Sequence, residues 1–293
     1  MHIGGCLDPA GRCARRGRDR LPAGQLAAAL PPGRLAITGC GTSYHVAQSV
    51  AAHWEAAGLG AADAFPASEM PVRDGYDAVV VVSRSGTTTE LLDLLDRLGD
   101  RTTLALVGSH GPVSAAAGAA LALDFADERS VVQTRFATSV VALFRARLGH
   151  DVDALATAAE RTLALPPPAL DGATRVVFLG TGPGVGIAHE AALKLREATL
   201  TATESYPAME YRHGPIALAE PGVVVWLLGT SPAGLADDVR GTGATVVDDD
   251  ADPLVDLVRV HSAALRLARA KGLDADRPRH LTRSVLLPGT QPT

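Results

Sequence analysis

The chain has 293 residues and a formal net charge of −5 at neutral pH. This length allows one large α/β domain or two domains of about 130 residues each. The acidic balance argues against a surface that binds nucleic acid or an anionic membrane, and no apolar run approaches the roughly 18 residues of a membrane span. Three cysteines show neither metal-ligand spacing nor disulfide density, so we expect a reducing, cytoplasmic environment.

Residues 1–30 form an arginine-rich leader with glycines and prolines but no periodic apolar face. We predict that this leader is disordered or loosely packed, and we assign it no function. An organelle transit peptide or an RNA-binding arm is the alternative interpretation of its arginines.

Beyond the leader, short runs of Val, Leu and Ile alternate with Ala- and Leu-rich stretches, which is the pattern of a parallel sheet covered by helices. Hydrophobic residues make up 47% of the chain but aromatic residues only 4%, so the core must come mainly from aliphatic side chains. The first half predicts strands at residues 35–38, 78–82, 103–107 and 120–124, with helices over 43–57, through 91–95 and over 134–148.

The pattern restarts after three consecutive prolines at 166–168, inside a predicted linker over 151–170. In both halves roughly 45 residues separate the first two strands, and the first strand runs into a glycine-rich turn. We therefore predict two tandem domains, 31–150 and 171–293, each a parallel sheet between layers of helices. The second half predicts strands at residues 175–179, 223–228 and 244–247, with helices over 186–198 and 254–270.

A cluster of hydroxyl side chains follows the second predicted strand, in the segment Ser-Arg-Ser-Gly-Thr-Thr-Thr-Glu at 83–90. A strand that ends in a small-residue turn before a helix presents backbone N–H groups to an anion, and Gly86 lets the backbone approach closely. Phosphate oxygens would be bound here by the hydroxyl groups of Ser83, Ser85, Thr87 and Thr88. The alternative is a Ser/Thr helix cap without a ligand, but so many hydroxyl groups exceed what capping requires.

The equivalent turn of the second half, at 229–234, has lost the hydroxyl cluster and gained Pro232, which has no N–H donor. We therefore expect one phosphate site per chain. A dinucleotide site is a poorer interpretation of the glycine-rich turns, because neither keeps the G-x-G-x-x-G spacing. In the first of these turns, Tyr44 occupies the position of the third glycine.

Charged residues gather on one face of the first helix of the second half. Glu190, Lys194 and Glu197 are spaced i, i+4, i+7. A solvent-exposed ladder of salt bridges is the alternative, but the surrounding Ala and Leu residues predict that part of this face is buried or lies in a cleft. A buried carboxylate can act as a base. His213, in a turn fixed by the glycine and proline that follow it, is a candidate proton shuttle.

Together, these motifs resemble the family of tandem sugar-isomerase (SIS) domains, which includes the isomerase half of glucosamine-6-phosphate synthase. The resemblance runs from Arg34 to Val285. It is carried, in order, by Gly39-Cys40-Gly41-Thr42-Ser43-Tyr44, the Ser-x-Ser-Gly-x-Thr loop at 83–88, Glu190-Ala-Ala-Leu-Lys-x-x-Glu197 and His213-Gly-Pro.

The resemblance implies roles for residues of the first half. It implies that a sugar phosphate is bound by Ser43, Ser83, Ser85 and Thr88. Arg84 and Gln133 lie in segments that look more like the stand-alone SIS-type amino-sugar-phosphate deaminases and isomerases than like the synthase. We expect both side chains to contact the substrate.

The resemblance also implies the catalytic residues. Glu197 matches the base that moves a proton between C1 and C2 of the open-chain sugar, and Glu190 and Lys194 match supporting positions on the same helix. His213 matches a ring-opening histidine that reaches the site from the neighbouring subunit. The resemblance therefore implies a homodimer.

The sequence departs from the synthase in two respects. The glutaminase half has no counterpart, because no catalytic cysteine follows Met1, so we do not expect glutamine-fed amination. Arg283 stands where the synthase carries a lysine that forms an imine with the ketose. An arginine stays protonated, so Arg283 and Arg84 are expected to neutralise developing charge instead.

These inferences predict an enzyme that isomerises and deaminates a hexosamine phosphate, such as glucosamine 6-phosphate, by ring opening and C1–C2 proton transfer. We expect no metal or organic cofactor, and neither a nucleic acid nor a membrane as partner. The alternatives are a plain aldose–ketose sugar-phosphate isomerase or a deglycase. From a different class, a non-catalytic sugar-phosphate sensor is the remaining alternative.

Overall fold

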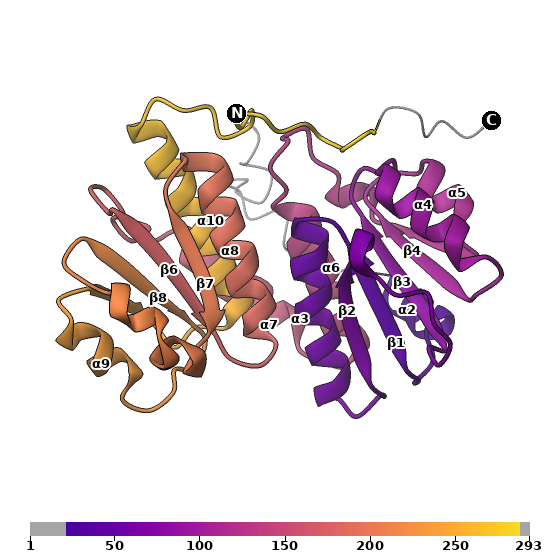
Figure 1. Ribbon diagram of the computed structural model, residues 1–293, viewed down its shortest axis with the longest axis horizontal. Coiled ribbons are helices and arrows are strands. Elements are labelled where there is room, and N and C mark those ends of the chain that lie inside the picture. The colour runs from indigo at the N-terminus through magenta and orange to yellow at the C-terminus, as the bar shows by residue number, and fades with distance from the viewer. Residues whose placement is uncertain (1–21, 288–293) are drawn as a thin grey trace. The chain divides into compact units, whose positions relative to one another are not determined.

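The computed structural model describes residues 22–287 (Figure 1). These residues form two compact units. The N-terminal unit comprises residues 22–152 together with the C-terminal tail, 280–287, and the C-terminal unit comprises residues 153–279. Residues 1–21 of the predicted leader lie outside the described residues. The end of that leader forms helix α2 (Ala23–Ala29), in which Leu26 is fully buried.

A five-stranded parallel sheet forms the centre of the N-terminal unit, with the strands in the order β2-β1-β3-β4-β5. Its strands are β1 (Leu35–Gly39), β2 (Ala62–Pro66), β3 (Ala78–Ser83), β4 (Thr103–Val107) and β5 (Ala119–Ala122). Besides α2, its helices are α3 (Thr42–Ala56), α4 (Thr89–Leu98), α5 (Pro112–Ala116) and α6 (Arg135–Arg147), with short 3-10 turns η2 (Ala67–Glu69) and η3 (Asp124–Ala126).

The C-terminal unit contains a four-stranded parallel sheet in the order β7-β6-β8-β9. Its strands are β6 (Arg175–Gly180), β7 (Thr203–Pro207), β8 (Val223–Leu228) and β9 (Thr245–Asp248). Its helices are α7 (Val152–Leu163), which begins at the boundary of the units, α8 (Gly184–Thr199), α9 (Leu235–Gly241) and α10 (Pro253–Ala270), with 3-10 turns η4 (Met209–His213) and η5 (Pro215–Leu218). The strands β6 to β9 repeat the order of β1 to β4.

Helices cover both faces of each sheet, which confirms the predicted α/β fold (Figure 1). The central strands are continuous apolar runs because side chains on both faces meet helices. In the N-terminal unit, Val79 and Val81 of β3 pack with Leu94 of α4, and α3 and α6 pack against each other on the other side of the sheet. No helix within residues 22–287 combines the length and the apolar composition that a bilayer crossing requires.

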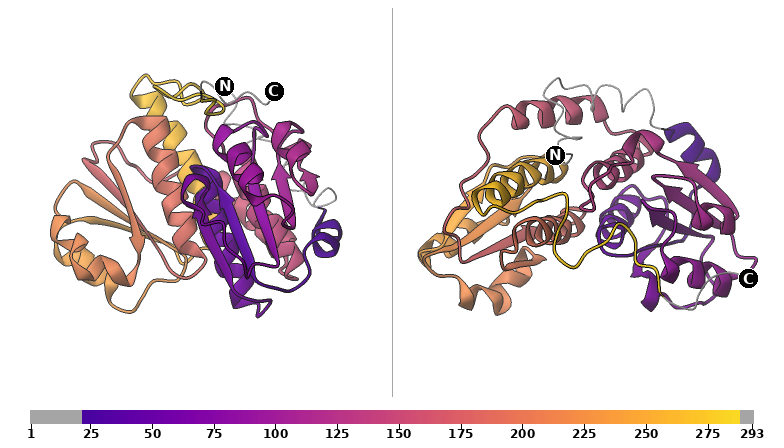
Figure 2. Two further views of the ribbon diagram at one scale, coloured as in Figure 1. Left: turned by 45° about the vertical axis from the view of Figure 1, so that its right-hand side comes forward. Right: turned by 90° about the horizontal axis from the view of Figure 1, so that it is seen from above.

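The C-terminal unit is layered in the same way. Val225 of β8 packs with Leu235 and Val239 of α9 on one face of the sheet. Helices α8 and α10 run side by side on the other face, as both Figure 1 and Figure 2 show. Each sheet thus has its own hydrophobic core, drawn from residues of its own unit.

The strands predicted from the sequence are present, but the structure adds two edge strands, β2 and β7, that the sequence patterns did not reveal. Their sequences, Ala-Asp-Ala-Phe-Pro and Thr-Glu-Ser-Tyr-Pro, are only partly buried and lack the Val/Leu runs of the central strands. An edge strand pairs on one side only, so it tolerates proline and polar residues. The spacing that the sequence predicted between the first two strands of each half is therefore the spacing between β1 and β3, and between β6 and β8. These strands are neighbours in the sheets, but an edge strand lies between them along the chain.

The strand order of the N-terminal sheet reverses between β1 and β3. In open α/β sheets, ligands bind at the carboxyl ends of the strands beside such a reversal. The turn after Gly39 and the loop after Ser83 both lie at that edge, because β1 and β3 are parallel neighbours. The topology therefore brings together the two segments in which the sequence predicted phosphate-binding residues.

Candidate functional site

The loop that follows β3, which we call the phosphate loop (residues 83–88), has a backbone that only glycine allows at its centre. Gly86 has a φ of +67°, and a Cβ atom there would lie 2.7 Å from the carbonyl oxygen of Ser109. The Gly86 N–H donates to Ser83 Oγ at 3.2 Å, and its carbonyl accepts from the Val113 N–H at 2.9 Å. The loop is thus fixed against the segment that follows β4.

Two hydroxyl groups of the phosphate loop meet just before α4. Ser85 Oγ lies 3.4 Å from Thr88 Oγ1, and the Thr87 N–H donates to Ser85 Oγ at 3.3 Å. Thr88 occupies the residue before the helix, but its side chain makes no capping hydrogen bond. Simple capping therefore does not explain these hydroxyl groups, and both lie at the positive end of the α4 dipole.

The turn after β1 supplies the second half of this edge. Ser43 lies buried in the first turn of α3, so close to Gly39 that a Cβ on the glycine would come within 2.5 Å of the serine Cβ. The Cys40 thiol in the same turn is hydrogen-bonded to Glu90 of α4. Burial, with the Glu90 charge as the next contribution, raises the pKa of Cys40 to about 12, so this cysteine remains a thiol.

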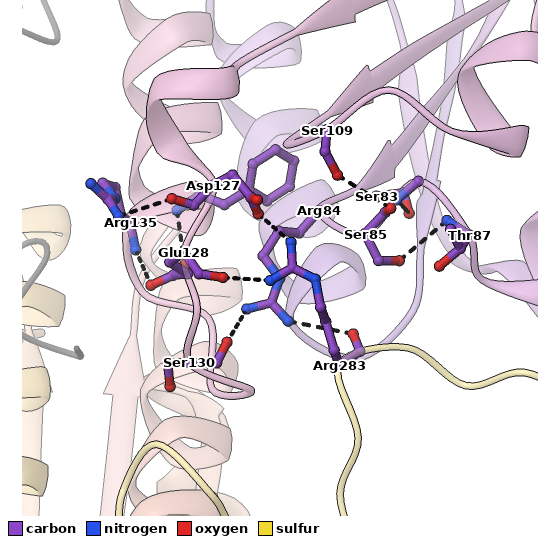
Figure 3. Close-up of polar contacts among 12 residues, drawn as sticks. Ser83, Arg84, Ser85, Thr87, Ser109, Asp127, Glu128, Ser130, Arg135 and Arg283 are labelled. Atoms are coloured by element: carbon purple, nitrogen blue, oxygen red, sulfur yellow. Dashed lines mark hydrogen bonds and ion pairs between the residues drawn. The ribbon is translucent and has the colours of Figure 1, made fainter. Parts of the chain in front are cut away.

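Arg84 and Arg283 were both predicted to act on the substrate, and the structure places both guanidinium groups on protein acceptors (Figure 3). Arg84 is buried and donates to the carbonyl oxygens of Ser130 and Val131, at 2.6 and 3.1 Å. Arg283 donates to the carbonyl oxygen of Glu128 at 2.5 Å and forms an ion pair with Asp127. The two arginines therefore hold the segment before α6.

Glu128 is a residue of this region that the sequence patterns did not single out. Its buried carboxylate accepts hydrogen bonds from the Thr134 N–H at 2.9 Å, the Thr134 hydroxyl at 2.8 Å and the Phe136 N–H at 3.3 Å. It thereby satisfies N–H groups at the start of α6. Gln133 lies inside this anchored segment, and its Oε1 atom is buried without a hydrogen-bond partner among the described residues.

A buried ionic cluster occupies one face of α8 in the C-terminal unit. Lys194 Nζ lies 2.5 Å from Glu197 Oε2 and 3.7 Å from Glu190 Oε1. The side chains of Lys194 and Glu190 are 2% and 0% exposed, whereas that of Glu197 is 17% exposed. The burial predicted for this helix face is confirmed. Glu197 is the one carboxylate of the pair that keeps some access to solvent.

Two histidines beside this cluster were not predicted to matter. His261 of α10 is fully buried, and neither ring nitrogen has a hydrogen-bond partner within residues 22–287. Burial, assisted by the Lys194 charge, lowers the pKa of His261 to about 3, so the ring is neutral. His189 Nδ1 lies 2.8 Å from Ser205 Oγ, and burial lowers its pKa as well. A single histidine in an apolar helix gives no sequence signal that distinguishes such a site from ordinary core.

His213 ends the 3-10 turn η4 and is exposed. Gly214 follows with a φ of +137°, which a residue with a side chain rarely adopts. Met209 and Leu218, on either side of this turn, are 50% and 53% exposed. The turn therefore presents a histidine and apolar side chains to the surroundings. Its predicted role across a subunit interface stays a prediction.

The predicted site residues divide between the two units. The phosphate loop, Ser43, Gln133 and Arg283 belong to the N-terminal unit, and the α8 cluster and His213 belong to the C-terminal unit. Among the described residues, no group of three or more His, Cys, Asp or Glu side chains is arranged to hold a metal ion.

Residues 31–144 match the family model of the SIS domain. The chain is 27% identical to the isomerizing glutamine–fructose-6-phosphate aminotransferase of Mycobacterium tuberculosis, in a match that covers 85% of this chain and 50% of that protein. The chain thus spans about half the length of the curated relatives it matches.

Solved structures share the fold over nearly the whole chain. Glucosamine-6-phosphate deaminase from Thermotoga maritima matches with a TM-score of 0.81 and 24% identity, over 97% of this chain and 100% of that chain. Tagatose-6-phosphate ketose/aldose isomerase from Escherichia coli matches with a TM-score of 0.76 and 17% identity, over 91% of this chain and 92% of that chain. The interpretation of the C-terminal unit as a second SIS domain rests on the shared strand order and stays a prediction. The chain therefore contains a SIS domain, at residues 31–144, and is related to the isomerase half of the glutamine–fructose-6-phosphate aminotransferases.

Proposed function

We propose that the protein is a cytoplasmic enzyme that converts a hexosamine phosphate, such as glucosamine 6-phosphate, to a ketose phosphate and ammonia. The observation that carries the proposal is the pair of hydroxyl groups on Ser85 and Thr88, which lies at the start of α4 without capping it. A phosphate group would accept hydrogen bonds from these hydroxyl groups, and its negative charge would lie at the positive end of the α4 dipole.

The relatives support the substrate class. The aminotransferases are named for fructose 6-phosphate, and the Thermotoga maritima structure is a glucosamine-6-phosphate deaminase. Both names contain a six-carbon sugar with its phosphate on C6. We extend that class to this chain because its phosphate loop lies at the edge of the sheet where α/β proteins bind ligands. Ser43 and the Gln133 amide would contact the same ligand from the neighbouring turn and from the segment before α6.

The proposed proton transfer uses Glu197. The Lys194 ammonium group donates to Oε2 of this carboxylate and compensates its charge, which leaves Oε1 to take the proton from C2 of the open-chain sugar. Return of that proton to C1, with transfer of one proton from the C2 amine to the C1 oxygen, gives a C1 hydroxyl group and an imine at C2. Water then adds to the imine and ammonia leaves, so one hexosamine phosphate and one water yield one ketose phosphate and one ammonia.

His213 would open the sugar ring by moving a proton between the ring oxygen and the C1 hydroxyl. Its exposed turn, flanked by exposed Met209 and Leu218, supports a location at a subunit interface. We therefore propose a homodimer in which His213 serves the site of the neighbouring subunit. Every step uses a side chain or water, so the reaction needs neither a metal nor an organic cofactor.

The test is to incubate the purified chain with a panel of amino-sugar phosphates and to measure ammonia and ketose together. We expect equal amounts of both from at least one hexosamine phosphate. Ketose formation without ammonia, from the corresponding hexose phosphates, would instead assign the chain to the aldose–ketose isomerases. Thermal stabilisation by a sugar phosphate without turnover would assign it to the sensors. Neither ammonia nor ketose across the panel would defeat the enzymatic proposal.

A further inference from the structure

Arg84 is a charged side chain inside the N-terminal unit, only 1% exposed although it lies next to the phosphate-binding serines. Besides the carbonyl oxygens of Ser130 and Val131, its Nη2 atom reaches the carbonyl oxygen of Arg283 at 3.4 Å. A buried charge is tolerated only when hydrogen bonds replace its hydration. These carbonyl oxygens come from two segments far apart in the sequence, so Arg84 joins both of them to the phosphate loop (Figure 3).

The C-terminal tail (residues 280–287) also contacts the phosphate loop and the start of α4 directly. The Thr87 hydroxyl donates to Ser284 Oγ at 3.0 Å. The Thr89 N–H donates to the Val285 carbonyl oxygen at 3.3 Å, and the Leu287 N–H donates to Thr89 Oγ1 at 3.1 Å. With the tail in place, Thr87 and the first amide of α4 are already bonded. These contacts fix the chain on either side of Thr88 in one conformation, and the tail makes no hydrogen bond to the hydroxyl groups of Ser85 and Thr88 among those of the described residues.

One contact in this arrangement is more accessible than the rest. The ion pair between Arg283 and Asp127 leaves 38% and 35% of the two side chains exposed, whereas Arg84 is buried. The same Arg283 side chain donates to the Glu128 carbonyl oxygen, beside the carboxylate that anchors the start of α6. Release of this pair would remove the side-chain contacts of the tail to Asp127 and Glu128, while the Arg84 contacts to Ser130 and Val131 stay buried.

We propose that Arg84 and Arg283 are positioning residues rather than catalytic ones. In this proposal the Asp127–Arg283 ion pair is a latch: it holds the C-terminal tail on the phosphate loop, and the tail in turn increases the affinity of that loop for a sugar phosphate. This inference rests on the phosphate site of the proposed function but not on turnover. Arginine suits the role because its planar fork can bond a carbonyl oxygen and a carboxylate together, which a lysine cannot reproduce.

The latch is tested by the binding of sorbitol 6-phosphate, an open-chain sugar phosphate without a carbonyl group, to the full chain by calorimetry. Asp127→Asn and Arg283→Gln should each raise the Kd about threefold to tenfold. The double variant should raise it no further than either single one, because both remove the same contact. Asp74→Asn is the matched control, since Asp74 forms an exposed ion pair with Arg101 in the same unit, and its Kd should equal that of the wild type.

Salt separates a latch from a general loss of structure. The ratio of the Asp127→Asn and wild-type Kd values should shrink towards one as sodium chloride rises from about 20 mM to about 500 mM, because salt screens a half-exposed pair. Trypsin should also cleave the Asp127→Asn tail after Arg279 faster than the wild-type tail.

The outcomes separate the latch from the proposed function. If the wild-type chain binds sorbitol 6-phosphate and the Kd is unchanged in Asp127→Asn and Arg283→Gln, the latch alone is overturned. A wild-type chain that does not bind it would overturn the phosphate site as well, and binding without ammonia release would overturn only the proposed reaction.

Discussion

The Lys194 ammonium group lies between two carboxylates of one helix, 2.5 Å from Glu197 and 3.7 Å from Glu190. Only Glu197 keeps part of its side chain exposed, so the arrangement separates a fully buried carboxylate from one that keeps contact with solvent. The adjacent His261 is held neutral by burial, which leaves Lys194 as the positive centre of this cluster.

Glu197→Gln should lower kcat about 10²- to 10⁴-fold, the usual contribution of a general base, with little change in KM. Glutamine keeps the shape and can still accept from Lys194, but it cannot take a proton from carbon. Ammonia release under steady-state conditions measures the effect. Glu220→Gln, which changes an exposed carboxylate of the same unit, is the control and should behave as wild type. A Glu197→Gln enzyme within about threefold of wild-type kcat would remove Glu197 from the proton transfer.

A second single residue, Asp256 of α10, makes the stability of the C-terminal unit depend on pH. Its carboxylate is fully buried and accepts the Gly229 N–H at 3.3 Å. Burial raises its pKa to about 7, and the charges of Asp252 and Asp248 add to the effect while the Gly229 N–H opposes it. Because the folded state holds this proton more tightly than the unfolded chain, the stabilisation is complete below the ordinary carboxyl pKa of about 4 and is lost as the pH rises through about 7.

Asp256→Asn should therefore become more stable relative to wild type as the pH rises from 5 to 8, by roughly 3 kcal/mol, since about two pH units of this range lie below the folded pKa of about 7 and each corresponds to about 1.4 kcal/mol. Asparagine keeps an oxygen for the Gly229 N–H but carries no charge at any pH. Urea unfolding of both proteins at several pH values gives the comparison. A difference between them that stays constant over this range would show that Asp256 does not titrate as described.

At the scale of the elements, the start of α6 depends on a carboxylate that lies outside the helix. Glu128 accepts from three N–H groups at this end, those of Thr134, Arg135 and Phe136, and its negative charge lies at the positive end of the helix dipole. Glu128→Gln should lower the free energy of unfolding of the N-terminal unit by about 1–3 kcal/mol, because one carboxylate oxygen is exchanged for an amide that can only donate. Urea unfolding measures this loss. Glu69→Gln, at an exposed carboxylate of the same unit, should stay within about 0.5 kcal/mol of wild type.

The elements also show what the sequence could predict. The Val and Leu runs of β3, β4 and β8 were predicted because strands buried on both faces leave no room for polar side chains. The edge strands β2 and β7 were not, since one-sided pairing tolerates polar residues and proline. The phosphate loop was visible because its hydroxyl groups and glycine are consecutive in the chain.

The contacts of Arg84 and Arg283 could not be predicted from the same patterns. Their contacts join segments that are 199 residues apart in one case and 155 in another. A sequence motif shows that a guanidinium group is present, but the acceptors that bind it are set by the tertiary structure. Glu128 was overlooked for a related reason, because its six-residue distance from Thr134 matches no capping box.

At the scale of the whole molecule, each unit has its own core and its own buried tryptophan. The chain contains two tryptophans, Trp54 in the N-terminal unit and Trp226 in the C-terminal unit, both fully buried. Leu94 of α4 and Leu235 of α9 are equally buried members of the two separate clusters. Replacement of one tryptophan, in Trp54→Phe or Trp226→Phe, therefore leaves the fluorescence of the other tryptophan as a reporter of the unit that contains it.

We expect Leu94→Ala to destabilise the unit reported by Trp54 and Leu235→Ala to destabilise the unit reported by Trp226, each by about 2–5 kcal/mol. The midpoint of urea unfolding for the other reporter should move much less in each case, because the deleted methyl groups belong to one core only. If both reporters shifted together by equal amounts, the chain would unfold as a single cooperative body.

Because the C-terminal tail contributes contacts to the N-terminal unit, that unit can be completed only after the rest of the chain has been synthesised. Domains generally fold as they emerge from the ribosome, the earlier one first. Residues 22–152 emerge before the whole C-terminal unit, yet Ser284, Val285 and Leu287 bond to Thr87 and Thr89 only after that unit has been made. The phosphate loop is therefore among the first parts of the protein to be synthesised and the last to receive all of its contacts. A ribosome that stops near residue 280 would release a chain with both sheets but without the tail contacts to Thr87 and Thr89.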